Sequence, residues 1–122
     1  MTKQEFITTI YANETQFTAA VNKYINHNYP ELRQMYFHIA NESATSAAMR
    51  IKLHSMGVLA GVPDFCILLP YVWFLELKYG NGKLSDKQKH LHQLWKSKGI
   101  IVETAYNAED VITLIDRSLT KL

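Results

Sequence analysis

The sequence predicts a single α/β domain, residues 1–122, in which helices flank a central mixed sheet of about four strands. Segments whose apolar side chains recur at helical spacing alternate with short apolar runs, as in proteins of this class. Two of the runs, 64–69 and 72–78, are separated by only two residues, the first of them Pro70, which indicates a hairpin. The last run, 100–104, follows a helix, and a helical crossover makes it parallel to the strand before that helix.

Composition limits the classes of protein to consider. With 122 residues, 48% of them hydrophobic and 20% charged, the chain resembles a soluble globular domain large enough to form its own core. No apolar run is long enough to span a bilayer. The single cysteine, Cys66, excludes disulfides and thiolate zinc sites and fits a reducing cytoplasm, which is the expected location. The net charge is only +2, so binding to nucleic acid would depend on where the charges lie.

The first firm helix is expected to begin after Asn13, a residue type that caps helices, with Gln16 three positions later. It should end within the polar segment 26–30. Residues 2–12 before it form either a short helix or an extended arm. Glu14, in the first turn, has two interpretations: an acid favoured there by the helix dipole, or a carboxylate aimed at a functional site.

The next elements are a strand over residues 35–40 and a helix that Ser43 can cap and that runs to about residue 55. Arg50 and Lys52 give this helix a basic character.

The helix after the hairpin is expected to open with a capping box, in which Ser85 and Gln88 bind each other's backbone N–H groups. Its predicted buried stripe consists of Leu91, Leu94 and Trp95. Gln88 either only caps the helix or also reaches the ends of the strands. Asn107 is the expected cap of the final helix.

The charged residues of the hairpin are expected to meet. With the turn at Pro70, Asp64 lies opposite Glu76 within about one residue of register. Glu76 and Lys78 are two residues apart and share one face of their strand. Buried charges are costly unless they are paired or bind a cation, and two adjacent carboxylates resist ionisation. Either a hard cation such as Mg²⁺ or Mn²⁺ binds between them, or Lys78 forms a buried salt bridge with one acid.

These residues also carry a resemblance to a known family. Pro63-Asp64, an intervening strand and Glu76-Leu77-Lys78 match the signature of the PD-(D/E)XK nucleases. The wider pattern resembles the virus-type replication-repair nuclease (VRR-NUC) branch of that superfamily, over roughly residues 14–115. Its further features are Met56-Gly57, Gly61-Val62-Pro63-Asp64-Phe65, and Gly82-Lys83-Leu84-Ser85 followed by Gln88.

The resemblance implies a restriction-endonuclease-like core and a Mg²⁺- or Mn²⁺-dependent endonuclease that cuts DNA. The implied metal ligands are Asp64, Glu76, the Leu77 carbonyl and, as an outer or second-site acid, Glu14. Lys78 would hold the attacking water and offset charge on the phosphate, and Gln88 would orient water or a phosphate oxygen. Standalone VRR-NUC proteins of phage and bacterial origin are homodimers that act on branched DNA, so a homodimer and four-way junctions are the expected assembly and substrate. His38 and Asn41 would border the site, or they are an ordinary strand histidine and turn asparagine without a role in it.

A local excess of lysine also favours nucleic-acid binding. Six lysines and one acid lie between positions 78 and 98, a stripe that suits phosphate binding but is also common on a solvated face. The candidate DNA contacts are Arg50, Lys52, Lys83, Lys87 and Lys89. The histidines offer no zinc motif, and His90 and His92 are expected on different helix faces. The alternative function is a nucleic-acid-binding or interaction module of the same fold that does not cut.

Overall fold

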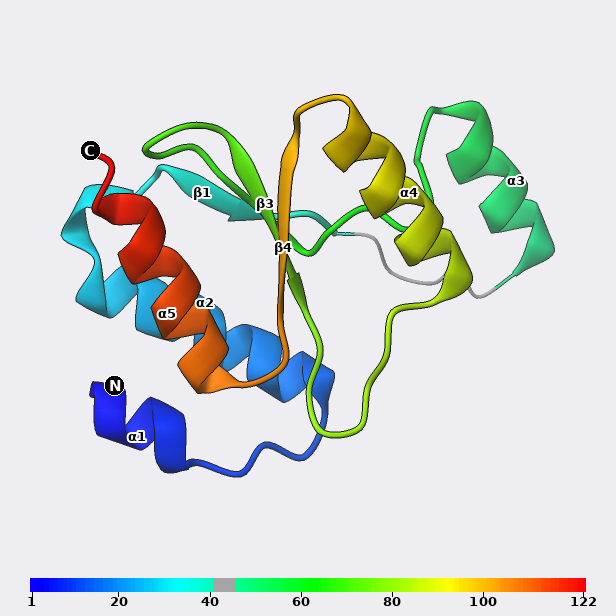
Figure 1. Ribbon diagram of the computed structural model, residues 1–122. Coiled ribbons are helices and arrows are strands. Elements are labelled where there is room, and N and C mark those ends of the chain that lie inside the picture. The colour runs from blue at the N-terminus through cyan, green and yellow to red at the C-terminus, as the bar shows by residue number, and fades with distance from the viewer. Residues whose placement is uncertain (41–45) are drawn as a thin grey trace.

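The computed structural model describes residues 1–40 and 46–122, and Figure 1 shows the order of its elements. The predicted order is confirmed, and residues 2–12 include a short helix, α1. The elements are α1 (Lys3–Thr8), α2 (Glu14–Asn28), the 3₁₀ turn η1 (Pro30–Leu32), β1 (Tyr36–His38), α3 (Ala47–Ser55), β2 (Phe65–Ile67), β3 (Trp73–Leu77), α4 (Asp86–Ser97), β4 (Ile101–Ala105) and α5 (Ala108–Leu119). Asn41 and Ser43, which the sequence singled out, lie outside the described residues; the N-cap of α3 is Ser46.

The four strands form one mixed sheet in the order β1-β2-β3-β4. The first two pairs are antiparallel and β3 pairs with β4 in parallel, as a helical crossover requires. Phe65 pairs with Leu75 in the β2–β3 hairpin. Continuing this register by one residue places Asp64 opposite Glu76, as the hairpin predicted.

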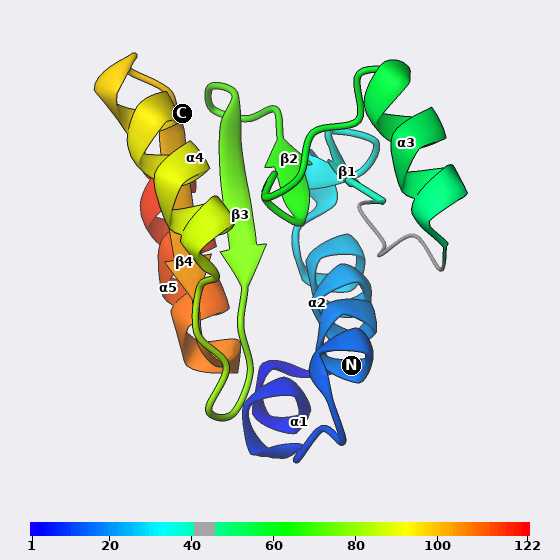
Figure 2. The ribbon, with the colours of Figure 1, turned by 90° about the vertical axis from the view of Figure 1, so that its right-hand side faces the viewer.

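The two faces of the sheet are covered unequally. On one face α1, α2 and α5 pack with the sheet into an aromatic-rich core that includes Phe6, Phe17, Trp73, Leu75 and Ile115. On the other face α4 lies over the β3–β4 side, where Trp95 contacts Phe74 with ring centroids 4.9 Å apart. In Figure 2 α3 stands beyond the β1 side, and none of its side chains is buried. The described part of the chain has no helix long and apolar enough to cross a membrane.

Three helix starts follow the predicted caps, whereas α3 is capped by Ser46 and not by Ser43. Asn13 accepts a hydrogen bond from the Gln16 amide, Ser85 and Gln88 form the complete capping box, and Asn107 caps α5. Each cap fixes where the following helix begins, and therefore where Glu14 and Gln88 lie.

The predicted buried stripe of α4 is partly wrong. Leu91 is buried, but Leu94 is 46% exposed, and the buried neighbour is His92. At about 100° per residue, Leu94 lies roughly 110° from the centre of the stripe formed by 88, 91, 92 and 95. The sheet-facing side of α4 therefore includes two polar residues, Gln88 and His92.

Candidate active site

The centre of the site is Glu76, whose side chain is only 2% exposed although it can carry a charge. It lies on the face of β3 that α4 covers. Its Oε1 accepts a hydrogen bond from Gln88 Nε2 at 3.1 Å. Its Oε2 is buried and has no hydrogen-bond partner among the described residues. A buried oxygen of this kind has lost its water without gaining a hydrogen bond in the protein, which is unfavourable unless another group contacts it.

Asp64 is held beside Glu76 by backbone groups of two other strands. Its Oδ2 accepts a hydrogen bond from the Leu77 amide at 2.7 Å. Its own carbonyl accepts one from Ile39, just after β1, at 2.7 Å. The Asp64 carboxylate is therefore held against β3, and its backbone is held against the residue that follows β1.

Lys78 lies between two acids from distant parts of the chain. Its Nζ is 3.8 Å from Glu76 Oε1 and 3.9 Å from Glu14 Oε1, and its side chain is 12% exposed. Both distances are long, so neither acid forms a tight ion pair with it. Glu14, at 44% exposure, faces the site from the first turn of α2. Tyr79 helps to hold the start of α2 near the site. Its hydroxyl accepts a hydrogen bond from the Tyr11 amide, just before α2, at 2.9 Å.

Gln88 fills both of the roles that the sequence left open. Its amide oxygen accepts from the Ser85 backbone N–H at 2.9 Å, which completes the capping box. Its amide nitrogen donates to Glu76 Oε1. The start of α4 therefore sets the position of Glu76.

The sequence reasoning missed His92 as a residue of this site. It is buried, with Nε2 4.0 Å from Glu76 Oε2 and 3.2 Å from the Gly61 carbonyl oxygen. Burial lowers the pKa of His92, so the ring is neutral near pH 7 and the Glu76 contact is not an ion pair. The available signal was its spacing of four from Gln88, which places both residues on one face of a helix.

Burial sets the protonation of Glu76. Loss of water and the nearby Asp64 carboxylate raise the pKa of Glu76 from 4.5 to about 9, and the ammonium of Lys78 offsets only part of this rise. In the protein alone, Glu76 is therefore protonated at neutral pH. A cation beside both acids would reverse this preference, since it favours the two charged forms.

The oxygen ligands suit a hard cation but form only part of a coordination shell. Among residues 1–40 and 46–122, no three His, Cys, Asp or Glu side chains gather closely enough to hold a metal ion by themselves. Asp64 and Glu76, with one unpaired oxygen, are a two-carboxylate set of the kind that Mg²⁺ uses together with water and substrate oxygens. Leu77 meets Asp64 through its amide, so a role for its carbonyl stays a prediction.

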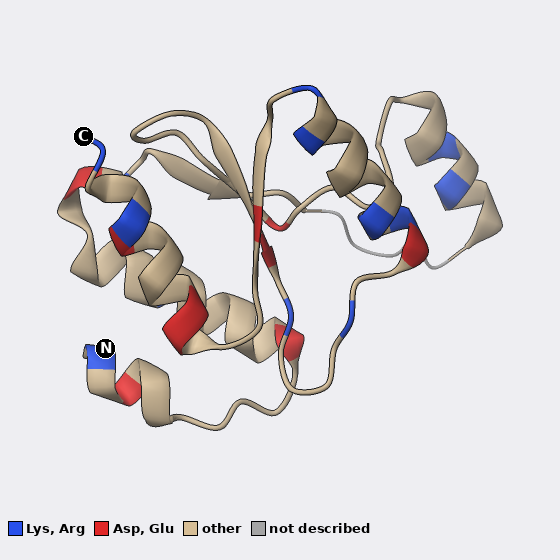
Figure 3. Cartoon of the chain, in the orientation of Figure 1, with Lys and Arg blue, Asp and Glu red and all other residues tan. Residues whose placement is uncertain are grey.

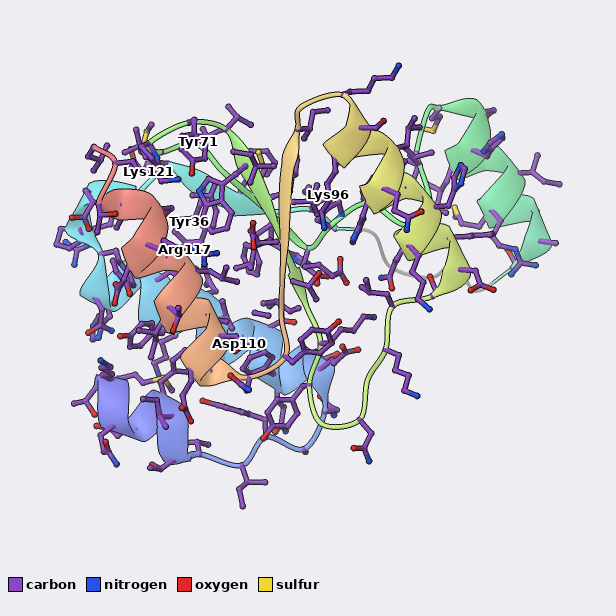
Figure 4. The ribbon with its side chains drawn as sticks, in the orientation of Figure 1. Tyr36, Tyr71, Lys96, Asp110, Arg117 and Lys121 are labelled. Atoms are coloured by element: carbon purple, nitrogen blue, oxygen red, sulfur yellow. The ribbon has the colours of Figure 1, made fainter. Side chains whose placement is uncertain are left out.

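A cavity of about 450 Å³ opens beside the acids. It is lined by residues of α2, the end of β1, the approach to β2 and the start of α4, including Glu14, His38, Asp64 and Gln88. His38 thus borders the site, as the resemblance implied. A second cavity, of about 300 Å³, lies near the end of α5 by Tyr71, Arg117 and Lys121, three residues that Figure 4 labels.

The candidate DNA contacts are exposed and lie on the α4 side of the molecule. Figure 3 shows basic residues on α3 and α4, with acidic residues on the strands between them and the core. Arg50 and Lys52 are on α3, Lys83 is in the loop before α4, and Lys87 and Lys89 are in its first turns. The structure thus places two basic segments outside the acidic centre.

Comparison with known proteins defines the fold. No protein-family model and no curated protein matches the chain. A solved structure described as "VRR_NUC domain protein" superimposes with a TM-score of 0.71 at 20% sequence identity, covering 92% of this chain and 91% of that one. A second, described as "VRR_NUC domain", gives a TM-score of 0.53 at 22% identity over 81% and 94% of the two chains. The chain therefore has the VRR_NUC fold, as the motifs predicted.

The raised pKa of Glu76 predicts how stability depends on pH. A raised folded-state pKa contributes stability that is complete below the unfolded value, 4.5, and is lost as the pH rises toward about 9. Glu76→Gln keeps the shape and cannot ionise, so without metal it should unfold about 5 °C higher than wild type near pH 8. The difference should shrink toward pH 5.

Circular dichroism melts from about pH 5 to pH 9 test this prediction. Glu31→Gln, which removes an exposed carboxylate, is the control for the change in net charge and should show no such trend. A pH-independent difference between Glu76→Gln and wild type would contradict the prediction.

Proposed function

We propose that this chain, which has the fold of VRR_NUC domain proteins, is a Mg²⁺- or Mn²⁺-dependent endonuclease that hydrolyses phosphodiester bonds of DNA. The observation that carries the proposal is the buried carboxylate of Glu76, beside Asp64, with one oxygen unpaired. A fold that keeps two acids together at this cost in stability needs a compensating partner, and a divalent cation is the simplest one.

The proposed ligands are Asp64 and Glu76, with the Leu77 carbonyl as a further one and Glu14 as an outer or second-site acid. When bound, the metal polarises a phosphoryl oxygen and lowers the pKa of water. Water and phosphate oxygens would complete the shell, since Mg²⁺ retains several waters and also takes substrate phosphates. Mg²⁺ and Mn²⁺ both suit an all-oxygen site.

Lys78 and Gln88 act on the reacting groups. The ammonium of Lys78 is near both Glu76 and Glu14 and tightly paired with neither, so it is free to hold the attacking water and to offset charge on the phosphate. Gln88 donates one hydrogen to Glu76 and has a second N–H, which would orient water or a phosphate oxygen.

The basic segments would hold the DNA. Arg50 and Lys52 on α3, and Lys83, Lys87 and Lys89 around the start of α4, would contact phosphates on either side of the scissile bond. Contacts of this kind fix the position of the duplex and do not read its sequence. The proposed selectivity is therefore for the shape of the DNA.

We further propose branched DNA, such as four-way junctions, as the substrate, a homodimer as the acting form and the cytoplasm of a bacterial or phage-infected cell as its location. The support is the resemblance of the motifs to standalone VRR-NUC proteins. A symmetric dimer would present two sites to two opposed strands.

A second candidate is a nucleic-acid-binding module that does not cut. The observation in its favour is that the described residues bring together two close carboxylates, not a complete metal site. Binding alone does not require a buried, destabilising acid such as Glu76. Cleavage assays decide between the two.

The first prediction is cleavage that depends on Mn²⁺. Wild-type protein should nick a labelled four-way junction with Mn²⁺ and be inactive with chelator, because the acids alone cannot activate water. Its circular dichroism should be the same with and without chelator, since the apolar core forms without metal. Asp64→Asn is the inactive control. Metal-independent cleavage, or unfolding on chelation, would contradict the metal role.

The second prediction concerns Lys78→Met, which keeps the aliphatic stem and removes the charge. The single-turnover rate at saturating DNA should fall by about 10² or more, as for other single electrostatic stabilisers. Mn²⁺ binding should be retained. Lys83→Met, an exposed lysine of the neighbouring loop, is the matched control and should change this rate little. A rate for Lys78→Met within about threefold of wild type would exclude the proposed role.

The third prediction separates binding from cutting. Changing Lys83 and Lys87 together to Gln should reduce the slope of log K against log salt by up to about 2 units, near 0.9 for each phosphate that the protein no longer neutralises. Binding should weaken alike for all sequences, and the saturated single-turnover rate should change much less.

Fluorescence anisotropy over a range of salt concentrations gives the slope. The matched control is the double change at Lys96 and Lys98, which removes the same charge from the far end of α4. An unchanged slope for the Lys83 and Lys87 variant would mean that these two lysines lie on a solvated face and do not contact phosphates. The DNA path would then move toward Arg50 and Lys52.

A further inference from the structure

α4 carries a buried histidine that the proposed chemistry does not use. His92 is 3% exposed, and the other buried polar side chains among the described residues are Glu76 and Ser118. Ser118 is explained within its own helix, because its hydroxyl donates to the Ile115 carbonyl. His92 instead reaches across to a different segment, so its burial needs a reason in the tertiary structure.

The contact geometry fixes what His92 does. Its Nε2 is 3.2 Å from the carbonyl oxygen of Gly61 and 4.0 Å from Glu76 Oε2. A carbonyl oxygen only accepts, so Nε2 must carry the proton and donate it. The distance to Glu76 is beyond a hydrogen bond. The N–H of His92 is therefore directed to the backbone of Gly61.

Gly61 begins the segment that delivers Asp64. Its φ is +88°, and a Cβ there would lie 3.1 Å from the backbone C and O of Lys87. The backbone of Gly61 thus packs directly against the first turn of α4, at a place where another residue would be both strained and crowded. Asp64 follows three residues later. The His92 hydrogen bond joins α4 to this segment next to that contact.

Two residues on one face of α4 therefore hold β3, which bears Glu76, and the segment before β2, which bears Asp64. Gln88 donates to Glu76 Oε1, and His92, four residues later, donates to Gly61. We propose that His92 is a positioning residue that sets the separation of the Asp64 and Glu76 carboxylates by holding the Gly61 carbonyl. This inference rests on the proposed metal-binding function.

The consequence is measurable without DNA. Without the His92 N–H, the Gly61 carbonyl has no donor from α4, and the segment to Asp64 shifts to find another. Groups that orient metal ligands from outside the first layer change metal affinity by about 10- to 100-fold. The binding constant for Mn²⁺ should therefore reveal the absence of this hydrogen bond, with the core unchanged.

The experiment uses the full chain, Mn²⁺ alone as the probe, and the variants His92→Gln, His92→Asn and His92→Phe. The Gln amide nitrogen sits at about the reach of histidine Nε2, whereas the Asn amide is shorter and Phe has no donor. By titration calorimetry, Asn and Phe should bind Mn²⁺ about 10-fold or more weakly, and Gln within about 3-fold of wild type. Metal-free hydrogen exchange at the Leu77 amide, which donates to the Asp64 carboxylate, should be faster in Asn than in Gln.

The Asn and Gln pair keeps the test decisive if the Phe variant does not fold. Equal Mn²⁺ affinity for Asn, Gln and wild type would overturn the inference while leaving the metal site intact. Asp64→Asn shows that the measured ion is at the proposed site, because its binding should be lost. Wild-type protein that binds no Mn²⁺ would overturn the proposed function, and this inference with it.

Discussion

The burial of the Glu76 carboxyl group on β3 is unfavourable, and the rest of the structure has to offset its cost. A carboxylate without water resists ionisation, and the second acid opposite it adds to the resistance. Lys78 is too far away to form a tight pair and offsets only part of the cost. What holds the arrangement is the apolar packing on the opposite face of the sheet, where Trp73, Leu75 and Leu77 alternate with the site residues along the same strand.

The helix that covers this acid also determines its geometry. The capping box makes Gln88 both the third residue of α4 and a donor to Glu76. Because the cap fixes the helix start, it also fixes the depth at which Gln88 and His92 meet the sheet. The close approach of Gly61 to the first turn joins the Asp64 segment to the same helix. The first turn of α4 therefore contacts both the Glu76 side chain and the segment that leads to Asp64.

The buried acid Glu76 and the exposed helix α3 lie in different parts of the molecule. The acids lie on strands with the whole aromatic core behind them, whereas α3 has no buried side chain and lies beyond the β1 side (Figures 1 and 2). Arg50 and Lys52 are on this open helix, and the other candidate contacts surround the start of α4. The buried acids and the exposed basic residues therefore belong to different elements of the fold.

The sequence by itself determined the elements and the pairing of the acids. Helical periodicity, the caps Asn13, Ser85 and Asn107, and the short hairpin are local features, so they predict helix starts and the Asp64–Glu76 register without knowledge of the fold. The tertiary structure decided what local pattern cannot contain. Packing against Phe74 sets which side of α4 meets the sheet. As a result, Leu94 is exposed and His92 is buried. The contact of Gly61 with α4 and the reach of Lys78 to Glu14 join segments far apart in the chain, and only the folded molecule fixes such distances.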